Sequence, residues 1–280
     1  MITEIINDTF DENTRQTINL NEHLSNSFDE VEIFLKVIQD KRERHLSKII
    51  DEYMHLLEQR RDTSLPKFSI EKFTPDYSNF QILKKYPKLM DKLEQSIFYH
   101  MNIREYEDNI SPDGDVDLSF SEFYRSYFMQ TCLLGLTLSS LFSREEALEL
   151  CKTQNIAKWE SAPPKEIETL EEFEGKDNYD REILTHRRHG LMGEGRYILK
   201  IERCLYGEVM RDFDDLEIAD SLECYIDYIL PVKKNKNFVM TRTKTIMKGD
   251  SWCDICYHDK RIVEKVEHPS DEFWENFKMH

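Results

Sequence analysis

The chain has 280 residues, of which 39% are hydrophobic and 11% aromatic. It is therefore long enough to bury a core, in one large domain or two modest ones, and its composition excludes a disordered chain. The net charge of −17 argues against nucleic acid and anionic membranes as partners, because their phosphate groups would be repelled.

The N-terminus, MITEIINDTFDENT, lacks the basic start and the apolar run of a secretion signal. The most apolar stretch, residues 127–142, is too short to cross a bilayer and predicts a buried helix. We therefore expect a cytoplasmic protein with no membrane partner. In that reducing compartment the six cysteines should be free thiols.

Apolar residues recur with a helical period from residue 29 to residue 61 and predict one long amphipathic helix. We expect its apolar stripe to pack against the rest of the chain, and a homodimer contact is the alternative. Further helices are predicted over 87–107, over 120–142, and from residue 144, where Ser143 and Glu146 have the spacing of a capping box. The acidic stretch 160–180, with its adjacent prolines, is predicted to be a surface loop.

The pattern changes in the last third of the chain. Residues 196–204 and 237–247 alternate polar and apolar side chains and predict strands, whereas residues 216–230 predict a helix. A turn at 248–250 leads into WCDICYH, which we expect to pair with 237–247 as an antiparallel hairpin.

These elements predict the α+β fold class. A helical N-terminal half (1–118) should precede an α+β domain (119–265), in which helices cover a small antiparallel sheet. A C-terminal tail (266–280) follows.

Two polar segments have weak metal or anion signals. SPDGDVDLSFSEF, residues 111–123, imitates the acidic spacing of a calcium loop, but Val116 stands where the turn glycine is needed. An acidic turn leading into a helix is the favoured interpretation. In THRRHG, residues 185–190, the arginines beside His186 and His189 disfavour a cation and suit a substrate carboxylate. A solvated loop is the favoured interpretation there, and recognition of a substrate carboxylate is the alternative.

The six cysteines are the most informative residues. Cys132 and Cys151 lie in predicted apolar helices and are expected in the core. Cys224 and Asp227 are spaced i, i+3, so they share one face of a helix. Because strand side chains alternate, the last strand should present two different faces. One face should carry Cys253, Ile255 and Tyr257, and the other Trp252, Asp254, Cys256 and His258.

This alternation argues against a structural zinc site. Cys253 and Cys256 form the only C-x-x-C in the chain, and within a flat strand they face opposite sides. No second C-x-x-C exists to complete four ligands. We assign no metal ligands and expect no cofactor, although a metal stays an open alternative.

The segments RCLYGEVMRDFDDLEIADSLECYIDYIL and TRTKTIMKGDSWCDICYH resemble the L-2-amino-thiazoline-4-carboxylic acid hydrolase family. An ordered set of residues carries the resemblance: Cys204, Tyr206, Cys224, Asp227, Gly249, Asp250, Cys253 and Asp254. Ile255 departs from the aromatic residue usual in that family. The first 110 residues have no counterpart in it, and a similar closing strand occurs in 4-vinyl-reductase-type binding domains.

The resemblance implies a hydrolase that opens a small cyclic amidine or thiazoline at a C–N bond. Cys253 or Cys224 would supply the thiol nucleophile, and Asp227 and Asp254 would hold the amidinium. His258 or His189 would transfer protons. Cys204, Tyr206 and Arg188 complete the expected substrate-binding set. The alternative function is a non-catalytic small-molecule-binding or partner-binding protein that uses the same fold.

Overall fold

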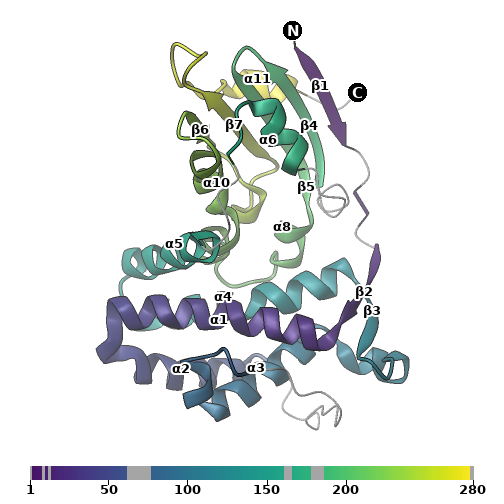
Figure 1. The fold of residues 1–280 in the computed structure, drawn as a ribbon, viewed down its shortest axis with the longest axis vertical. Coiled ribbons are helices and arrows are strands. Elements are labelled where there is room, and N and C mark those ends of the chain that lie inside the picture. Colours follow the sequence, from purple (N-terminus) through teal and green to yellow (C-terminus); the bar gives the residue numbers. More distant parts are fainter. Residues whose placement is uncertain are drawn as a thin grey trace. The chain divides into compact units, whose positions relative to one another are not determined.

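The computed structural model describes residues 2–7, 10–11, 14–61, 77–160, 166–177 and 186–277 (Figure 1). The chain forms two compact units. We call residues 13–159 with 221–223 the helical unit, and residues 1–12, 160–220 and 224–280 the sheet unit. The division of the chain after residues 118 and 265, which the sequence predicted, stays a prediction.

The helical unit opens with a short antiparallel pair of strands, β2 (Arg15–Asn19) and β3 (Asp115–Ser119). Its α-helices are α1 (Leu20–Arg42), α2 (Leu46–Gln59), α3 (Pro87–His100), α4 (Phe120–Leu141) and α5 (Arg144–Glu160). Short 3₁₀ turns lie between them: η1 (Glu43–His45), η2 (Leu83–Lys85) and η3 (Ile103–Asn109).

The single helix predicted for residues 29–61 is wrong, because η1 divides it into α1 and α2. Arg42, with φ −143° and ψ 37°, leaves the helical region at this break. Helix α1 also begins earlier than predicted, since the Asn19 side chain accepts hydrogen bonds from the N–H groups of Asn21 and Glu22. Most apolar side chains of both helices are buried, as expected. The homodimer contact stays a prediction.

Two predicted helix starts are confirmed. Glu146 N–H donates to Ser143 Oγ at 3.3 Å at the start of α5, and Ser119 with Glu122 forms a capping box at the start of α4. The acidic segment before α4 is a turn followed by β3. Its Asp115 side chain accepts a hydrogen bond from Asn19, so the acidic residues support the pairing of β2 with β3.

The sheet unit contains a five-stranded sheet in which every neighbouring pair is antiparallel. The strand order is β1 (Thr3–Asn7), β4 (His186–Gly193), β5 (Arg196–Cys204), β7 (Cys253–Asp259) and β6 (Phe238–Thr241). Its helical elements are α6 (Leu170–Asp177), α8 (Leu205–Val209), α9 (Leu216–Ala219), α10 (Ile226–Lys234), the 3₁₀ turn η5 (Ile246–Lys248) and α11 (Asp271–Asn276). The π-turn η4 (Asp220–Cys224) follows α9, and its ends belong to the sheet unit while residues 221–223 belong to the helical unit. The predicted α+β class and the β6–β7 hairpin are confirmed, although β6 is shorter than expected.

Two loop predictions are wrong. Residues 170–177 of the expected acidic loop form α6, because Leu170 and Phe173 are buried in the core. Residues 161–165 and 178–180 of that loop lie outside the described residues. The histidine–arginine segment is not a solvated loop either, since its residues from His186 onward belong to β4 and pair with both β1 and β5. Strand β1 itself had no counterpart in the prediction.

The apolar core of the sheet unit lies on one face of the sheet. It joins Leu199, Ile255 and Tyr257 of the strands to Phe173 of α6. In the helical unit Cys132 and Cys151 are fully buried, as predicted. No disulfide joins any of the six cysteines, all of which lie among the described residues. Within the described ranges, no helix has the length and apolar character needed to cross a membrane.

Candidate functional site

The register of the sheet divides the predicted site residues between its two faces. Side chains of directly paired residues lie on the same face of a sheet. One row runs from Arg188 through Ile201 to Cys253, and the next row runs from His189 through Lys200 to Asp254. We call the first side the core face, because Ile201 and Cys253 belong to the apolar core, and the second side the histidine face.

Helices cover both faces of the sheet within this unit. Phe173 of α6 packs against Tyr257 on the core face, and the backbone of Trp274 in α11 accepts a hydrogen bond from Lys200 on the histidine face. Figure 1 shows where α6 and α11 lie beside the sheet. The predicted alternation of the last strand is therefore confirmed. The two cysteines of the C-x-x-C also point to opposite sides. Cys253 lies on the core face, whereas Cys256 pairs with Ile198, whose side chain lies on the histidine face.

Three thiols gather on the core face. Cys204 and Cys253 belong to the apolar core, and Cys224 at the end of η4 interacts electrostatically with Cys204. The Cys253 sulfur accepts a hydrogen bond from Ile246 N–H at 3.3 Å, and its thiol donates to Thr245 Oγ1 at 3.7 Å. The sequence-predicted set Cys204, Cys224, Asp227 and Cys253 is thus brought together.

Burial keeps these thiols protonated at neutral pH. It raises the pKa of Cys253 to about 11 and that of Cys204 to about 12. It also raises the pKa of Cys224 well above the ordinary value, although the nearby Arg242 opposes this effect. A thiolate therefore does not pre-exist at this site. A thiol that reacts here needs a base to take its proton as it attacks.

Asp227 and Arg242 form the charged part of the cluster. Arg242 Nη1 donates to Asp227 Oδ2 at 2.7 Å, and Arg242 Nη2 lies 3.4 Å from Asp220 Oδ1. The guanidinium also lies 5.0 Å from the centre of the Tyr228 ring. Burial would lower the pKa of Arg242, but the carboxylates of Asp227 and Asp220 outweigh burial and raise it.

Asp227 has one oxygen available to a ligand. Arg242 occupies Oδ2, while no described residue donates a hydrogen bond to Oδ1, and 31% of the side chain is exposed. Burial of its surroundings raises the pKa of the Asp227 carboxyl, with Arg242 acting in the opposite direction. Asp220 differs, because Lys248 Nζ lies 2.9 Å from its second oxygen. Asp227 can therefore accept an N–H or a proton from a bound molecule.

Sequence reasoning missed Arg242. It follows β6 in TRTK, where the alternating pattern indicated only a strand. The signal available was electrostatic: Asp220 and Asp227 are seven residues apart in a predicted helix, so they share one of its faces, and two neighbouring carboxylates need a cation. Arg242 lies 15 residues from Asp227 along the chain, so no local spacing links the two residues.

Three predicted site residues lie on the histidine face instead. Asp254 and His258 are fully buried there, and His189 stacks on Phe277 with ring centres 4.2 Å apart. His189 Nε2 also lies 2.6 Å from Glu4 Oε1 of β1. The backbone of β7 therefore separates Asp254 and His258 from the thiols of the core face.

The other two predicted residues lie on the side of the core face. Arg188 occupies the same cross-strand row as Cys253 and is 6% exposed. Tyr206 packs partly against the apolar core, and its ring centre is 5.2 Å from that of His186. Within the described residues, no three His, Cys, Asp or Glu side chains are arranged to hold a metal ion.

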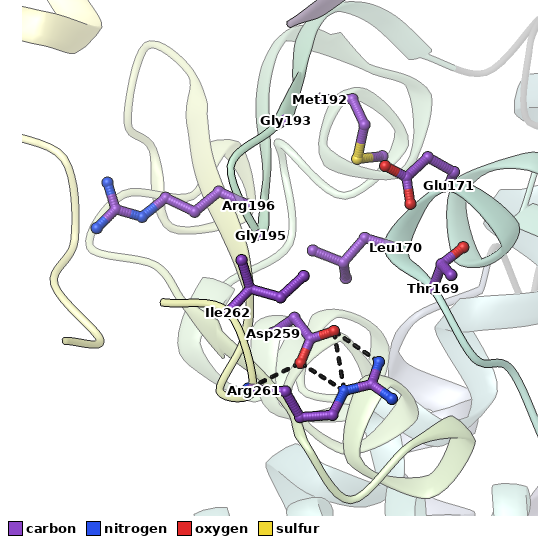
Figure 2. Close-up of a pocket in the computed structure, with 10 residues that line it drawn as sticks. All are labelled: Thr169, Leu170, Glu171, Met192, Gly193, Gly195, Arg196, Asp259, Arg261 and Ile262. Atoms are coloured by element: carbon purple, nitrogen blue, oxygen red, sulfur yellow. Dashed lines mark hydrogen bonds and ion pairs between the residues drawn. The ribbon is translucent and has the colours of Figure 1, made fainter. Parts of the chain in front are cut away.

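A small cavity of about 220 Å³ lies elsewhere in the sheet unit (Figure 2). Leu170 of α6, Met192 of β4 and Ile262 line it, together with the Asp259–Arg261 ion pair. Arg261 satisfies both oxygens of Asp259, and Figure 2 shows the Arg196 guanidinium pointing away from the cavity. None of the predicted site residues lines this cavity.

The fold and the core-face cluster define an α+β protein that holds thiols beside a guanidinium–carboxylate pair. Residues 141–257 match the family model of L-2-amino-thiazoline-4-carboxylic acid hydrolase. The resemblance is thereby confirmed for this part of the chain, which contains the whole core-face cluster. A search of curated proteins and a search of solved structures found no match.

Proposed function

We propose that the chain hydrolyses a C–N bond in a small cyclic amidine, with L-2-amino-thiazoline-4-carboxylate as the leading candidate substrate. The observation that carries the proposal is the joint placement of Cys224, Cys253 and Asp227 beside Arg242, within the segment that matches the hydrolase family. The family's name supplies the substrate class.

The charges at the site suit such a molecule. A cyclic isothiourea carries positive charge on an amidine-like group, and the free Oδ1 of Asp227 can accept one of its N–H groups. Arg242 fixes the other carboxylate oxygen and keeps Asp227 in place. Because the guanidinium is 4% exposed, this ion pair acts in surroundings that screen it less than water does.

The reaction needs a nucleophile and a base. In the proposed first step, a thiol of Cys253 or Cys224 adds to the amidine carbon while Asp227 takes the thiol proton. The C–N bond of the ring then breaks, and the departing nitrogen receives that proton. Water attacks the resulting thioester-like adduct, which restores the thiol and releases the ring-opened product. Overall, one water molecule is added and no redox partner is required.

This proposal narrows the residue set expected from the sequence. Asp254, His258 and His189 are left out of the reacting group because they lie on the histidine face. Asp227 replaces the histidines as the proton-transfer group. The thiol roles of Cys224 and Cys253 stay open between the two residues.

The second candidate function is binding without turnover. It is favoured by the raised pKa values of all three core-face thiols, which leave no thiolate in the resting protein. Such a protein would use Asp227 and Arg242 to hold a small amidinium compound and would release it unchanged.

One experiment separates the two functions. The full chain is incubated with L-2-amino-thiazoline-4-carboxylate, and mass spectrometry follows the gain of one water molecule. Calorimetry measures binding of the same compound in parallel. Turnover supports the hydrolase, and binding without turnover supports the second function. Neither turnover nor binding, by a chain whose circular dichroism shows it folded, contradicts both for this compound.

A further inference from the structure

Asp254 holds the segment that joins β6 to η5. Its Oδ1 accepts hydrogen bonds from the N–H groups of Thr243 and Lys244, each at 2.7 Å, and its Oδ2 accepts one from the Thr243 hydroxyl. Asp254 is fully buried, so these bonds compensate its charge in place of water. The carboxylate therefore fixes the backbone immediately after Arg242.

The same segment presents its other side to the candidate site. Arg242 reaches Asp227 and Asp220, while Thr245 and Ile246 contact the Cys253 sulfur. One short stretch of backbone thus connects the buried carboxylate on the histidine face to the reacting groups on the core face. Displacing residues 243–244 would move Arg242 and loosen the contacts around Cys253.

His268, from the C-terminal segment, completes the arrangement. Its Nε2 lies 3.1 Å from Asp254 Oδ2, and its Nδ1 lies 3.0 Å from Thr241 Oγ1. The indole N–H of Trp274 also lies 3.1 Å from Nε2, so two groups compete for this nitrogen. We assign the Nε2 proton to the contact with Asp254, because a buried carboxylate gains more from a hydrogen-bond donor than an indole N–H gains from an acceptor.

Thr241 connects His268 to the sheet. Its Oγ1 lies 3.0 Å from His268 Nδ1 and 3.0 Å from His258 Nε2, and its hydroxyl donates to the Cys256 carbonyl oxygen at 3.4 Å. Burial lowers the pKa of His258 to about 4, so its imidazole is neutral at neutral pH.

The C-terminal segment is anchored a second time, beyond His268. Lys200 Nζ, 4% exposed, donates to the carbonyl oxygens of Trp274 and Phe277 at 2.7 and 2.8 Å. These carbonyls lie at the end of α11, where a cation is favourable. The Trp252 ring lies 4.6 Å from the Lys200 ammonium and 4.8 Å from that of Lys244, which connects the anchor to the held segment.

We infer that His268 is a positioning residue: through Asp254 it fixes residues 242–246, and so it holds the Arg242–Asp227 pair and the Cys253 contacts of the proposed hydrolase site. The C-terminal segment 268–277 thereby controls a site on the opposite face of the sheet. This inference rests on the proposed function for its consequence in turnover. The effect of His268 on the backbone of residues 242–246 can be measured without an activity assay.

The test uses hydrogen exchange of the full chain. His268→Phe keeps a ring against Trp274 but removes both nitrogens. We expect amide exchange at 243–246 to rise about tenfold, the scale of losing one hydrogen bond to a charged group. Modification of Cys253 by a neutral thiol reagent should accelerate similarly. His268→Gln, which keeps a donor, should restore most of the protection.

A matched control lies in the same segment. Asp271→Asn removes the exposed ion pair between Asp271 and Lys244, 2.8 Å apart, and leaves His268 intact. Its exchange at 243–246 should equal that of the wild type. If the chain hydrolyses the thiazoline, His268→Phe should lower kcat/KM about tenfold, whereas Asp271→Asn should not change it.

The inference is overturned if His268→Phe leaves exchange at 245–246 and the labelling of Cys253 unchanged. Should that variant unfold, with exchange rising in the helical unit as well, Asp254→Asn is judged by the same criterion. A chain with no hydrolase activity but with raised exchange at 243–246 would contradict the proposed function alone. If His268→Gln restores the protection of residues 243–246 from exchange, His268 acts through its hydrogen-bond donor and not through the volume of its ring.

Discussion

Cys253 and Asp254 are adjacent in the chain, yet they lie on opposite faces of the sheet: Cys253 pairs with Ile201 of the apolar core, and Asp254 pairs with Lys200 under the C-terminal segment. One peptide bond therefore separates a thiol of the proposed reacting group from the carboxylate that holds the neighbouring backbone. The two residues should respond differently to substitution.

The thiols of the two faces provide the first prediction. Cys253→Ser and Cys224→Ser remove the candidate nucleophiles, so at least one of these variants should abolish turnover of the thiazoline. Cys256→Ala is the matched control, because its side chain lies on the histidine face. Steady-state rates of the three variants check the assignment, and full activity in both serine variants would exclude a thiol nucleophile.

The redox state of the cysteines gives a second prediction. We expect all six thiols to be counted when the protein is denatured without reductant, because no disulfide joins them in the described structure. In the native protein the core-face thiols should react slowly with a thiol-counting reagent, because they are buried and protonated. A count of four or fewer in denaturant would show a disulfide and contradict the expected reducing compartment.

Glu223 of the helical unit should make stability depend on pH. Burial raises its pKa from 4.5 to about 7, although Lys158 opposes the rise. The folded state thus binds the proton more tightly than the unfolded state does. The stabilising effect is full below pH 4.5 and is lost as pH rises to about 7, at a cost of at most about 3 kcal/mol.

The variant Glu223→Gln removes this titration. Its free energy of unfolding, from urea denaturation, should equal that of the wild type at pH 4.5 and exceed it at pH 8. Glu149→Gln, an exposed substitution on α5, serves as the control and should show no such divergence. Parallel curves for Glu223→Gln and the wild type across this range would count against the assignment.

A buried carboxylate in α1 gives a prediction on stability alone. Glu32 is fully buried and accepts hydrogen bonds from the N–H groups of residues 81, 82 and 83, which fixes the segment before α3. Glu32→Gln places an amide N–H against these donors and should cost about 2 kcal/mol or more. Chemical denaturation measures the loss, and the exposed substitution Glu52→Gln should stay within about 0.5 kcal/mol of the wild type.

Local pattern predicted much of the fold. The alternation of WCDICYH placed Cys253 and Asp254 on their correct faces, and Ser143 marked a helix start through cap chemistry that a sequence displays directly. The break at Arg42 was missed because a helical period continues across one non-helical residue. Helix α6 was missed because its acidic residues outnumber its two apolar side chains, Leu170 and Phe173, which pack into the core.

Only part of the site could be predicted from the sequence, because some of its contacts join residues that are far apart in the chain. The family-like set identified the thiols and Asp227, but Arg242 and His268 act through contacts that form only when the chain folds. Strand β1 is the extreme case, since Ile6 pairs with His189 across most of the sequence. Non-local pairing leaves no periodic trace, so the sequence did not show that His189 lies on the face opposite the thiols. Asp254 was grouped with the thiols by the family resemblance alone, against the alternation of its own strand.

The most direct measurement is kcat/KM of Asp227→Asn on L-2-amino-thiazoline-4-carboxylate, beside the wild type and Cys256→Ala. Asn keeps the shape of Asp227 but can neither take a proton nor balance an amidinium. We predict a fall of about a hundredfold or more for Asp227→Asn, the scale of losing one well-placed electrostatic group, with wild-type rates for Cys256→Ala. Equal kcat/KM for Asp227→Asn and the wild type, with both proteins folded, would contradict a reacting site on the core face.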